Sequence, residues 1–447
     1  MPSSLEYRRT DRWRLPLLLL ALVPLFPEYI SFFLVLAACG AAVPALRDDR
    51  CQLKVGLLGE LLLAYIAYMA ITVFYTVSRS STLCTAGMWA FFFLVFLLLK
   101  NLLVTHHRVD TFLRYITYVA ATVGLISCIL YLVGVLTDTN PLYFWKPLDD
   151  AVFRVLPIHI TDPYYHLRIG STFTNPNILS EYMTATLPFS LCYCGTRKKA
   201  KERTAAYIAV ALMLAGIVLT FSRGGYIALA FLLAALIVLN IRRHFAGVVA
   251  SVMAVILFIP QKVGDRILSI LPGLHTGSSL LDFFTSGADP SYNQAQEILR
   301  QSTADLSINA RWNIWLESAR QFLQYPLFGS GAGVETTRLL LKAHQINAIH
   351  AHNTILQILV EGGVFALILI GLVGLKTAHS SITLLRRGRN TRAFYHGLAA
   401  LGFIAAFCIE GLADYPLLTP KLVCNFMLLL ALIEQMSHLP AKKNTES

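Results

Sequence analysis

Long apolar runs, separated by short polar segments, follow one another along most of the chain. A helix needs about 20 apolar residues to cross a bilayer, and these runs predict about twelve helical spans. They lie near residues 15–27, 29–46, 53–77, 84–104, 111–135, 173–195, 204–222, 224–240, 245–261, 352–376, 393–413 and 417–436. The pattern therefore predicts an all-α, polytopic membrane protein in which residues 1–447 form a single integral membrane domain.

Two segments between the apolar runs are too long to be simple connections. Residues 136–172 are expected to form a first loop outside the cytoplasm, and residues 262–349 a second, larger one. In the larger loop, apolar residues between Ile308 and Phe322 recur at three- and four-residue steps, which predicts an amphipathic helix. Pro326 and the glycine-rich residues 329–333 are expected to end it.

Basic residues distinguish one set of connections from the other. They gather in residues 8–14, 47–54, 197–203, 242–243, 386–392 and 442–443, whereas the alternate short connections carry few charges. Lys and Arg concentrate on the cytoplasmic side of membrane proteins. We therefore expect a multi-pass protein of a bacterial inner membrane, with both termini in the cytoplasm and both long loops in the periplasm.

Composition agrees with this reading. Hydrophobic residues make up 56% of the chain and charged residues only 14%, whereas a soluble domain carries about 25% charged residues. The net charge of +12 is explained by cytoplasmic connections that meet anionic membrane lipids, so no nucleic-acid partner is expected. The eight cysteines lie outside both long loops, which argues against a disulfide framework.

Arg223 is the first candidate for chemistry, because a charged residue among apolar ones is costly and needs a reason. It lies in residues 220–225 (TFSRGG), where two glycines permit a tight turn. An arginine at this outer end of a span favours binding of an anionic group. The alternative is an arginine that extends to the membrane interface without a ligand.

A second candidate lies where another span begins. Asn175 is expected to cap the helix and Pro176 to be its first residue, so the free N–H groups of that helix end favour phosphate binding. Arg168 would add positive charge, and Asn177 and Glu181 lie one turn apart as a polar strip. Helix capping and interhelical hydrogen bonds alone are the competing interpretation.

The third candidate is the return of the larger loop into the membrane. His350 and His352 precede Asn353, which is followed at four-residue steps by Gln357 and Glu361. A histidine titrates near neutral pH, and arginines nearby would favour its neutral form, which suits a general base. The alternative is an interface histidine that makes one hydrogen bond.

Arg311 begins the amphipathic helix of the larger loop, where an arginine at lipid headgroups would give the same pattern. No metal site is predicted. Two residues apart on a helix end, His350 and His352 would diverge, and Asp149 with Asp150 has no histidine or second acidic cluster nearby in the sequence. No cofactor is expected either. Three arginines, a helix N-terminus and a histidine fit a lipid-linked diphosphate, since planar guanidinium groups bind phosphate bidentately.

Several of these residues together resemble the O-antigen ligase-related family. The similar segments are residues 222–224 (SRG), Arg311 with the following tryptophan, residues 326–331 (PLFGSG) and residues 352–363 (HNTILQILVEGG), with weaker likeness around Arg168 and residues 172–177. The resemblance implies a membrane glycosyltransferase fold of the GT-C-like kind, with a ligase-related core at 204–375.

The resemblance also implies an activity. Members of the family use polyprenyl-diphosphate-linked glycans as donors, and the acceptor here would be a lipid A core or another glycan. Arg223 and Arg311 are then expected to hold the diphosphate and His352 to act at the acceptor hydroxyl, in a metal-independent, inverting transfer. A polymerase of O-antigen or exopolysaccharide and a protein O-oligosaccharyltransferase stay open as alternatives.

A transporter or flippase of lipid-linked sugars is the alternative from another class. Such a protein typically shows inverted repeats and helices broken at mid-membrane. The sequence indicates neither of these features, and its polar residues gather at one face. We therefore expect an enzyme.

Overall fold

The computed structural model describes residues 11–48, 53–137, 143–155, 168–238, 311–388 and 391–440. Within these ranges the chain is helical, and no strand is assigned beyond an isolated bridge between Tyr143 and Ser171. The labelled α-helices are α2 (Arg14–Leu22), α3 (Glu28–Asp48), α4 (Gly56–Ile71), α5 (Arg79–Leu102), α6 (His106–Thr137), α7 (Lys146–Val155), α8 (Pro176–Gly195), α9 (Ala200–Leu219), α10 (Arg223–Val238), α15 (Val334–Ala343), α16 (Thr354–Leu385), α17 (Arg392–Gly411) and α18 (Pro420–His438).

Short 3₁₀ turns extend three of these helices, at Val23–Leu25, Thr72–Phe74 and Pro416–Leu418. Residues 311–324 are also helical, so the helix that we predicted in the larger loop is confirmed in its described part. The helix α15 was not predicted, because its polar and apolar residues alternate over only ten positions. The remaining residues of the larger loop, 262–310, lie outside the described residues.

Eight described helices are long and apolar enough to cross a membrane: α3, α4, α5, α6, α9, α16, α17 and α18. Shorter apolar helices at Arg14–Leu25 and Arg223–Ala235, together with α8, coincide with three further predicted spans. The span predicted at 245–261 lies outside the described residues. The polytopic, all-helical class is therefore confirmed, whereas the total of twelve spans and the GT-C-like fold stay predictions.

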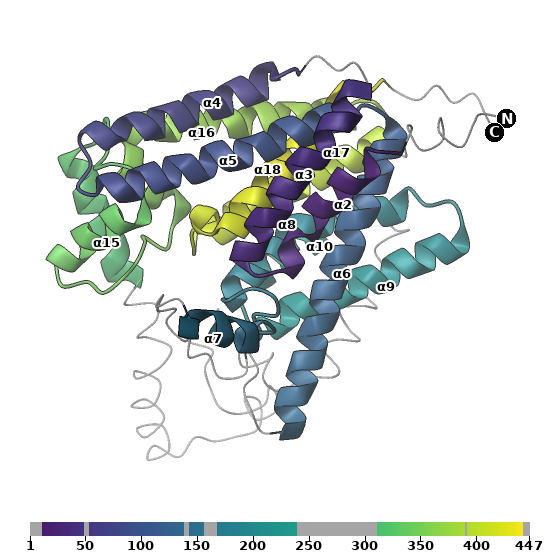
Figure 1. The fold of residues 1–447 in the computed structure, drawn as a ribbon, viewed down its shortest axis with the longest axis horizontal. Helices are drawn as coiled ribbons and strands as arrows, with labels where there is room; N and C mark the ends of the chain where they lie inside the picture. Colours follow the sequence, from purple (N-terminus) through teal and green to yellow (C-terminus); the bar gives the residue numbers. More distant parts are fainter. Residues whose placement is uncertain are drawn as a thin grey trace.

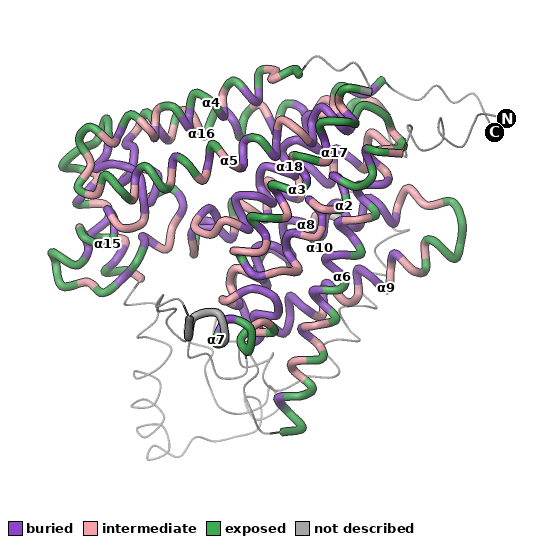
Figure 2. Tube along the Cα trace, in the orientation of Figure 1, coloured by how far each residue is buried: buried purple, intermediate pink, exposed green. Residues whose placement is uncertain are grey.

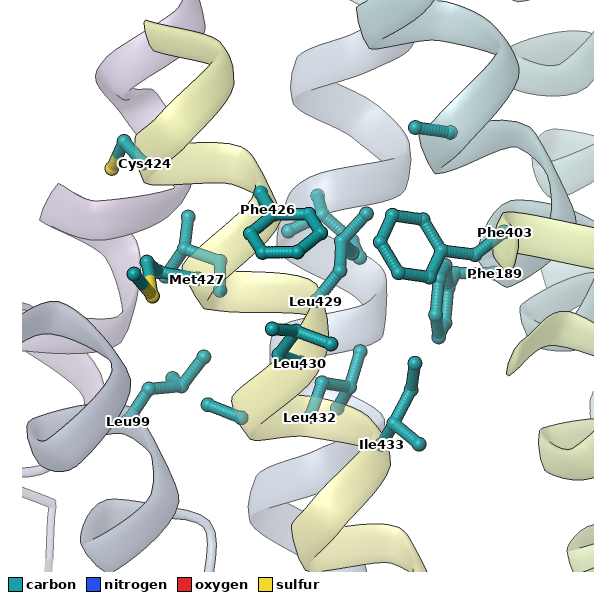
Figure 3. Close-up of a cluster of buried hydrophobic side chains, with 14 of the residues drawn as sticks. Leu99, Phe189, Phe403, Cys424, Phe426, Met427, Leu429, Leu430, Leu432 and Ile433 are labelled. Atoms are coloured by element: carbon teal, nitrogen blue, oxygen red, sulfur yellow. The ribbon is translucent and has the colours of Figure 1, made fainter. Parts of the chain in front are cut away.

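The helix α18 lies at the centre of the bundle. Of its 18-residue apolar window 83% is buried, against 28–56% for the other candidate spans, and it packs against α5, α8, α16 and α17 (Figure 1). Figure 3 shows how it does so: Phe426 of α18 faces Phe403 of α17, with Leu429, Leu430 and Ile433 in successive turns. Because this helix is surrounded by protein, its position fixes the helices around it.

The outer helices have exposed faces (Figure 2), and these faces carry apolar residues. Leu57 and Ile71 of α4 are each 56% exposed, and Leu132 and Leu136 of α6 are 56% and 74% exposed. Apolar surface of this extent marks contact with a membrane or another protein. Together with the helix lengths, it indicates that lipid surrounds the bundle.

Ion pairs gather at the end of the bundle that holds the α8–α9 and α16–α17 connections. Asp110 pairs with Arg392 at 2.7 Å and with Arg197 at 3.3 Å. Glu434 is buried and lies 3.7 Å from Lys100. We call this the basic end. Its connections are those that the sequence assigns to the cytoplasm, although the orientation itself stays a prediction.

The helix α16 is broken at Gly363, which has a left-handed φ of 63°. The loop after residue 324 packs into this break: Ser330 N donates to Val360 O at 2.7 Å, and Val364 N donates to Pro326 O at 2.9 Å. A Cβ on Gly329 would lie 2.5 Å from the backbone nitrogen of Gly362. From the sequence we expected no broken span, and that expectation was wrong, because glycines permit a kink that a loop then fills.

Candidate functional site

Polar side chains converge at the end of the bundle opposite the basic end, where α8, α10, α16 and α18 begin and α17 ends. We call this the site end. The helix α16 begins after Asn353, whose side chain accepts a hydrogen bond from Leu356 N at 3.1 Å and donates to Leu412 O at 3.1 Å. Asn353 therefore fixes the start of α16 against the end of α17.

The two histidines lie in the turn that leads into α16. His352 has a φ of 47°, its backbone N donates to His350 Nδ1 at 3.1 Å, and the ring centroids lie 4.0 Å apart. Our expectation that the two rings diverge was wrong, because these residues precede the helix and do not follow its geometry. The His350 side chain is 8% exposed and that of His352 is 30% exposed, so His352 is the more accessible of the two.

Asp414, in the connection between α17 and α18, links these residues to α8. Its Oδ1 lies 3.2 Å from His352 Nδ1 and accepts from Tyr415 N at 3.0 Å. Its Oδ2 accepts from Asn177 Nδ2 at 3.0 Å. We did not single out Asp414 from the sequence. The available signal was an isolated acidic residue in a short connection at the outer end of a span.

Electrostatics support an ionised Asp414. Burial alone would raise the pKa of Asp414, but the hydrogen bond from His352 and the charges of His352, His350 and Arg311 lower it well below its ordinary value. An ionised carboxylate only accepts hydrogen bonds, so a neutral His352 would carry its proton on Nδ1 and leave Nε2 to accept one. The pKa of His350 is lowered to about 4, first by burial and then by His352, with Asp414 opposing.

Arg168 joins the same polar network. Its Nη2 donates to Asn177 Oδ1, and its Nε donates to Thr220 O at 2.9 Å, next to the turn before α10. Asn175 accepts from Asn177 N at 2.8 Å, so the predicted cap of α8 with Pro176 as its first residue is confirmed. Arg168, Asn177, Asp414 and His352 thus form one continuous chain of contacts.

Arg311 lies on the same side of the site as the histidines. Its charge acts on both His350 and Asp414. One turn further along its helix, Trp315 Nε1 donates to His352 O at 3.2 Å. This contact holds the helix of residues 311–324 next to the turn that carries His352.

Arg223 is the first residue of α10, and the glycines after it pack closely on α8 and α17. A Cβ on Gly224 would lie 2.4 Å from Glu410 Oε2, and one on Gly225 would lie 2.0 Å from Ser180 Oγ. Ser180 Oγ donates to Glu410 Oε1 at 2.9 Å. Glu410 lies one turn before Asp414, so the start of α10 and the Asp414 connection meet at the same helix end.

Three predicted site residues are buried below this network. Gln357 accepts from Ala351 N at 2.8 Å and donates to Thr337 at 2.9 Å and Glu361 at 2.7 Å. Glu361 and Glu181 are 1% and 5% exposed. Gln357 therefore holds the turn of the two histidines through Ala351 N, and Glu361 holds Gln357 in turn.

His350, His352 and Asp414 also form a group whose ligand atoms lie within 4.8 Å of one another. Two imidazoles and a carboxylate are a donor set that Zn²⁺ accepts. The same Asp414 oxygen already accepts from His352 and Tyr415 N, as in a hydrogen-bonded His–Asp pair. The acidic residues that we considered from the sequence do not converge: Asp149 accepts from Tyr29, and Asp150 pairs with Lys146 at 3.5 Å.

Comparison with known proteins identifies the class to which this architecture corresponds. A family model described as "O-Antigen ligase" matches residues 208–371, the segment from α9 to the broken part of α16. The resemblance stated from the sequence is therefore confirmed, since the matched segment covers the arginine of α10, the helix of Arg311 and the histidine turn. No curated protein matches the chain.

Proposed function

We propose that this protein transfers a glycan from a polyprenyl diphosphate to a sugar hydroxyl at the periplasmic face of the inner membrane. The acceptor that we favour is the lipid A core, which would make the protein an O-antigen ligase. The observation that supports this most directly is the contact of 3.2 Å between His352 Nδ1 and Asp414. It lies in one network with Arg168 and beside the helix of Arg311, in a chain with an O-antigen ligase domain.

In this proposal His352 is the general base. As the acceptor oxygen attacks the anomeric carbon, His352 Nε2 takes the hydroxyl proton, and Asp414 stabilises the imidazolium that forms. The bond between the anomeric carbon and the diphosphate oxygen breaks, and its electron pair leaves with the diphosphate. Attack from the face opposite the leaving group inverts the anomeric carbon.

In the proposed reaction, arginines stabilise the negative charge of the leaving diphosphate. Arg223 and Arg311 bind the diphosphate, and their fixed charges stabilise it as it leaves. Arg168, with Asn175 and Asn177 at the N-terminus of α8, adds positive potential from the other side. His350 and Asn353 shape the acceptor side, and the transfer needs no metal ion.

The competing functions make different products from the same donor. An O-antigen or exopolysaccharide polymerase would join one lipid-linked glycan to another, and a protein O-oligosaccharyltransferase would use a hydroxyl of Ser or Thr. A deletion strain that accumulates long lipid-linked polymer indicates a ligase, whereas one that accumulates single repeats indicates a polymerase. A flippase would move lipid-linked sugar across the membrane without any new glycosidic bond.

The test is a paired measurement of transfer rate and donor binding for purified protein in lipid nanodiscs. His352→Ala should lower transfer by about a hundredfold or more, because general-base catalysis contributes that much, while donor binding barely changes. Arg223→Ala and Arg311→Ala should weaken both, and lysine should rescue them poorly. His344→Ala, whose imidazole pairs with Glu317 at 3.1 Å, is the matched control. Near wild-type transfer by the His352 variant would contradict the proposed role.

A further inference from the structure

An apolar groove runs along the bundle between α16 and α17, with α18 as its floor. It has a volume of about 300 Å³, which is at the lower end of the range for typical ligand sites. Its walls include Ile358 and Val373 of α16, Phe407 of α17 and Leu430 of α18. The rings of Phe426 and Phe403, which Figure 3 shows next to each other, also line it, with their centroids 6.1 Å apart.

The outer end of the groove meets the polar network of the site. Thr354, Gly411 and Leu412 line it there. Thr354 Oγ1 donates to Asp414 O at 3.2 Å, and Leu412 O accepts from Asn353 at 3.1 Å. The groove therefore begins directly beside the connection that carries Asp414, one residue from the turn that carries His352.

Two glycines keep the groove open on its lipid-facing side. Gly371 and Gly374 of α16 line it and are exposed, and a Cβ built on either residue meets no atom within 4 Å. Glycine in a helix costs about 1 kcal/mol relative to alanine. Neither position needs glycine for backbone geometry or for close helix packing, so the open space itself is the feature that these residues provide.

We propose that this groove binds the isoprenoid tail of the donor, so that the tail lies between α16 and α17 while the diphosphate lies at the site end. This inference rests on the proposed function and adds the binding place of the lipid part. Along α17 and the residue after it, the lining runs from Phe403 to Leu412, nine residue steps or about 14 Å of helix rise. That is half of a hydrocarbon core of about 30 Å, so the groove holds the part of the tail next to the diphosphate.

The chemistry of the two ends selects this occupant. The groove is lined by apolar side chains with only Thr354 and Thr377 as polar ones, so it offers almost no hydrogen-bond partners to a peptide. Its outer end opens at a site with His352, Asp414 and the nearby charge of Arg311. An amphiphile with a phosphorylated head and a long apolar tail satisfies both ends at once.

A native cysteine gives a direct test. Cys408 of α17 lines the groove and is exposed, and Cys84 of α5 is exposed elsewhere on the bundle. In nanodiscs of constant phospholipid composition, each cysteine is labelled with N-ethylmaleimide and quantified by peptide mass spectrometry. A polyprenyl diphosphate should slow labelling of Cys408 and leave Cys84 unchanged, whereas inorganic diphosphate should protect neither thiol.

Equal labelling of Cys408 with and without polyprenyl diphosphate would overturn the proposal, and would indicate that ordinary phospholipid fills the groove throughout. Equal protection of Cys84 would overturn it as well, because the effect would then be general to the bilayer. Protection confined to Cys408 supports the proposal.

Filling the groove is the second measurement. Gly374→Phe places a ring in the open space and should weaken binding of the polyprenyl diphosphate at least about tenfold, because losing two buried methylene groups has that effect. Gly87→Phe is the matched control, since Gly87 of α5 is also exposed and its Cβ also meets nothing within 4 Å. Both variants should keep the wild-type thermal midpoint, because a Cβ at either position meets no atom within 4 Å.

The outcomes separate the two proposals. Wild-type protein that transfers glycan, together with a folded Gly374→Phe variant that binds donor normally, would overturn the groove and leave the proposed function intact. Wild-type protein that binds polyprenyl diphosphate with protection of Cys408, but forms no glycosidic bond with any glycan acceptor, would overturn the proposed transfer and leave the groove intact.

Discussion

Asp414 shows how a single side chain can organise this site. Its two oxygens contact His352 and Asn177, and the backbone carbonyl of the same residue accepts from Thr354. The starts of α8 and α16 are thereby tied to the connection between α17 and α18. Its ionised carboxylate, which is 15% exposed, also fixes the tautomer of a neutral His352, which determines the nitrogen that can take a proton.

The group of His350, His352 and Asp414 permits a test of the role of metal. A chelator in excess, such as EDTA, should leave glycan transfer by purified protein unchanged, because arginines supply the charge that a metal would otherwise provide. The measurement is the transfer rate before and after chelation, followed by addition of Zn²⁺ or Mg²⁺. Loss of activity that a divalent cation restores would instead identify His350, His352 and Asp414 as ligands.

The lowered pKa of His350 predicts that the stability of the protein depends on pH. Its pKa in the folded protein is about 4, below the ordinary 6.5, so between these values the unfolded chain binds the proton more strongly. Stability conferred by neutral His350 is therefore complete above pH 6.5 and falls as the pH drops towards 4, by about 3 kcal/mol in all. The thermal midpoint of His350→Gln should fall less than that of wild type over this range. Parallel curves for the two proteins would contradict this account.

At the scale of elements, the helices and their ends follow largely from the sequence. The apolar runs predicted the spans, and Asn175 identified the start of α8, because capping is a local property of a few residues. The break in α16 and the pairing of His352 with Asp414 did not follow. Asp414 is 62 positions from His352 in the chain, and contacts over such separations depend on how helices pack.

The packing of three helices explains why two glycines follow Arg223. Gly225 allows α10 to approach Ser180 of α8, and Gly224 allows it to approach Glu410 of α17. From the sequence, the pair indicated a tight turn, and the structure shows which helices it allows to approach. The close approach holds three helices together at the residue that we propose to bind diphosphate.

A double-mutant cycle tests this packing. Gly225→Ala should lower the transfer rate, because the new Cβ would lie 2.0 Å from Ser180 Oγ and must displace either Ser180 or α10. Ser180→Ala removes that oxygen, so the double variant should recover part of the loss, with a coupling energy of about 0.5–3 kcal/mol. Transfer rate and thermal midpoint are measured for all four proteins. Strictly additive effects would show that Gly225 and Ser180 do not share the contact.

For the whole molecule, the two ends of the bundle differ in chemistry. The basic end carries ion pairs such as Arg392 with Asp110, whereas the site end carries a hydrogen-bonded network around one carboxylate. Between them, α18 forms a core that is largely closed to lipid. A bundle of this kind places its chemistry on one side of a membrane, and from the positive-inside asymmetry we expect that side to face the periplasm.

Single-cysteine labelling tests this orientation. In a cysteine-free background, Ser80→Cys lies exposed at the start of α5, at the site end, and Ala200→Cys lies exposed at the start of α9, at the basic end. An impermeant thiol reagent should label Ser80→Cys in intact spheroplasts, and should label Ala200→Cys only after the membrane is permeabilised. Cysteines at Ser278 and Ser286, in the part of the larger loop outside the described residues, should behave like Ser80→Cys. The reverse pattern would place the site end in the cytoplasm, where a donor presented on the periplasmic face could not reach His352.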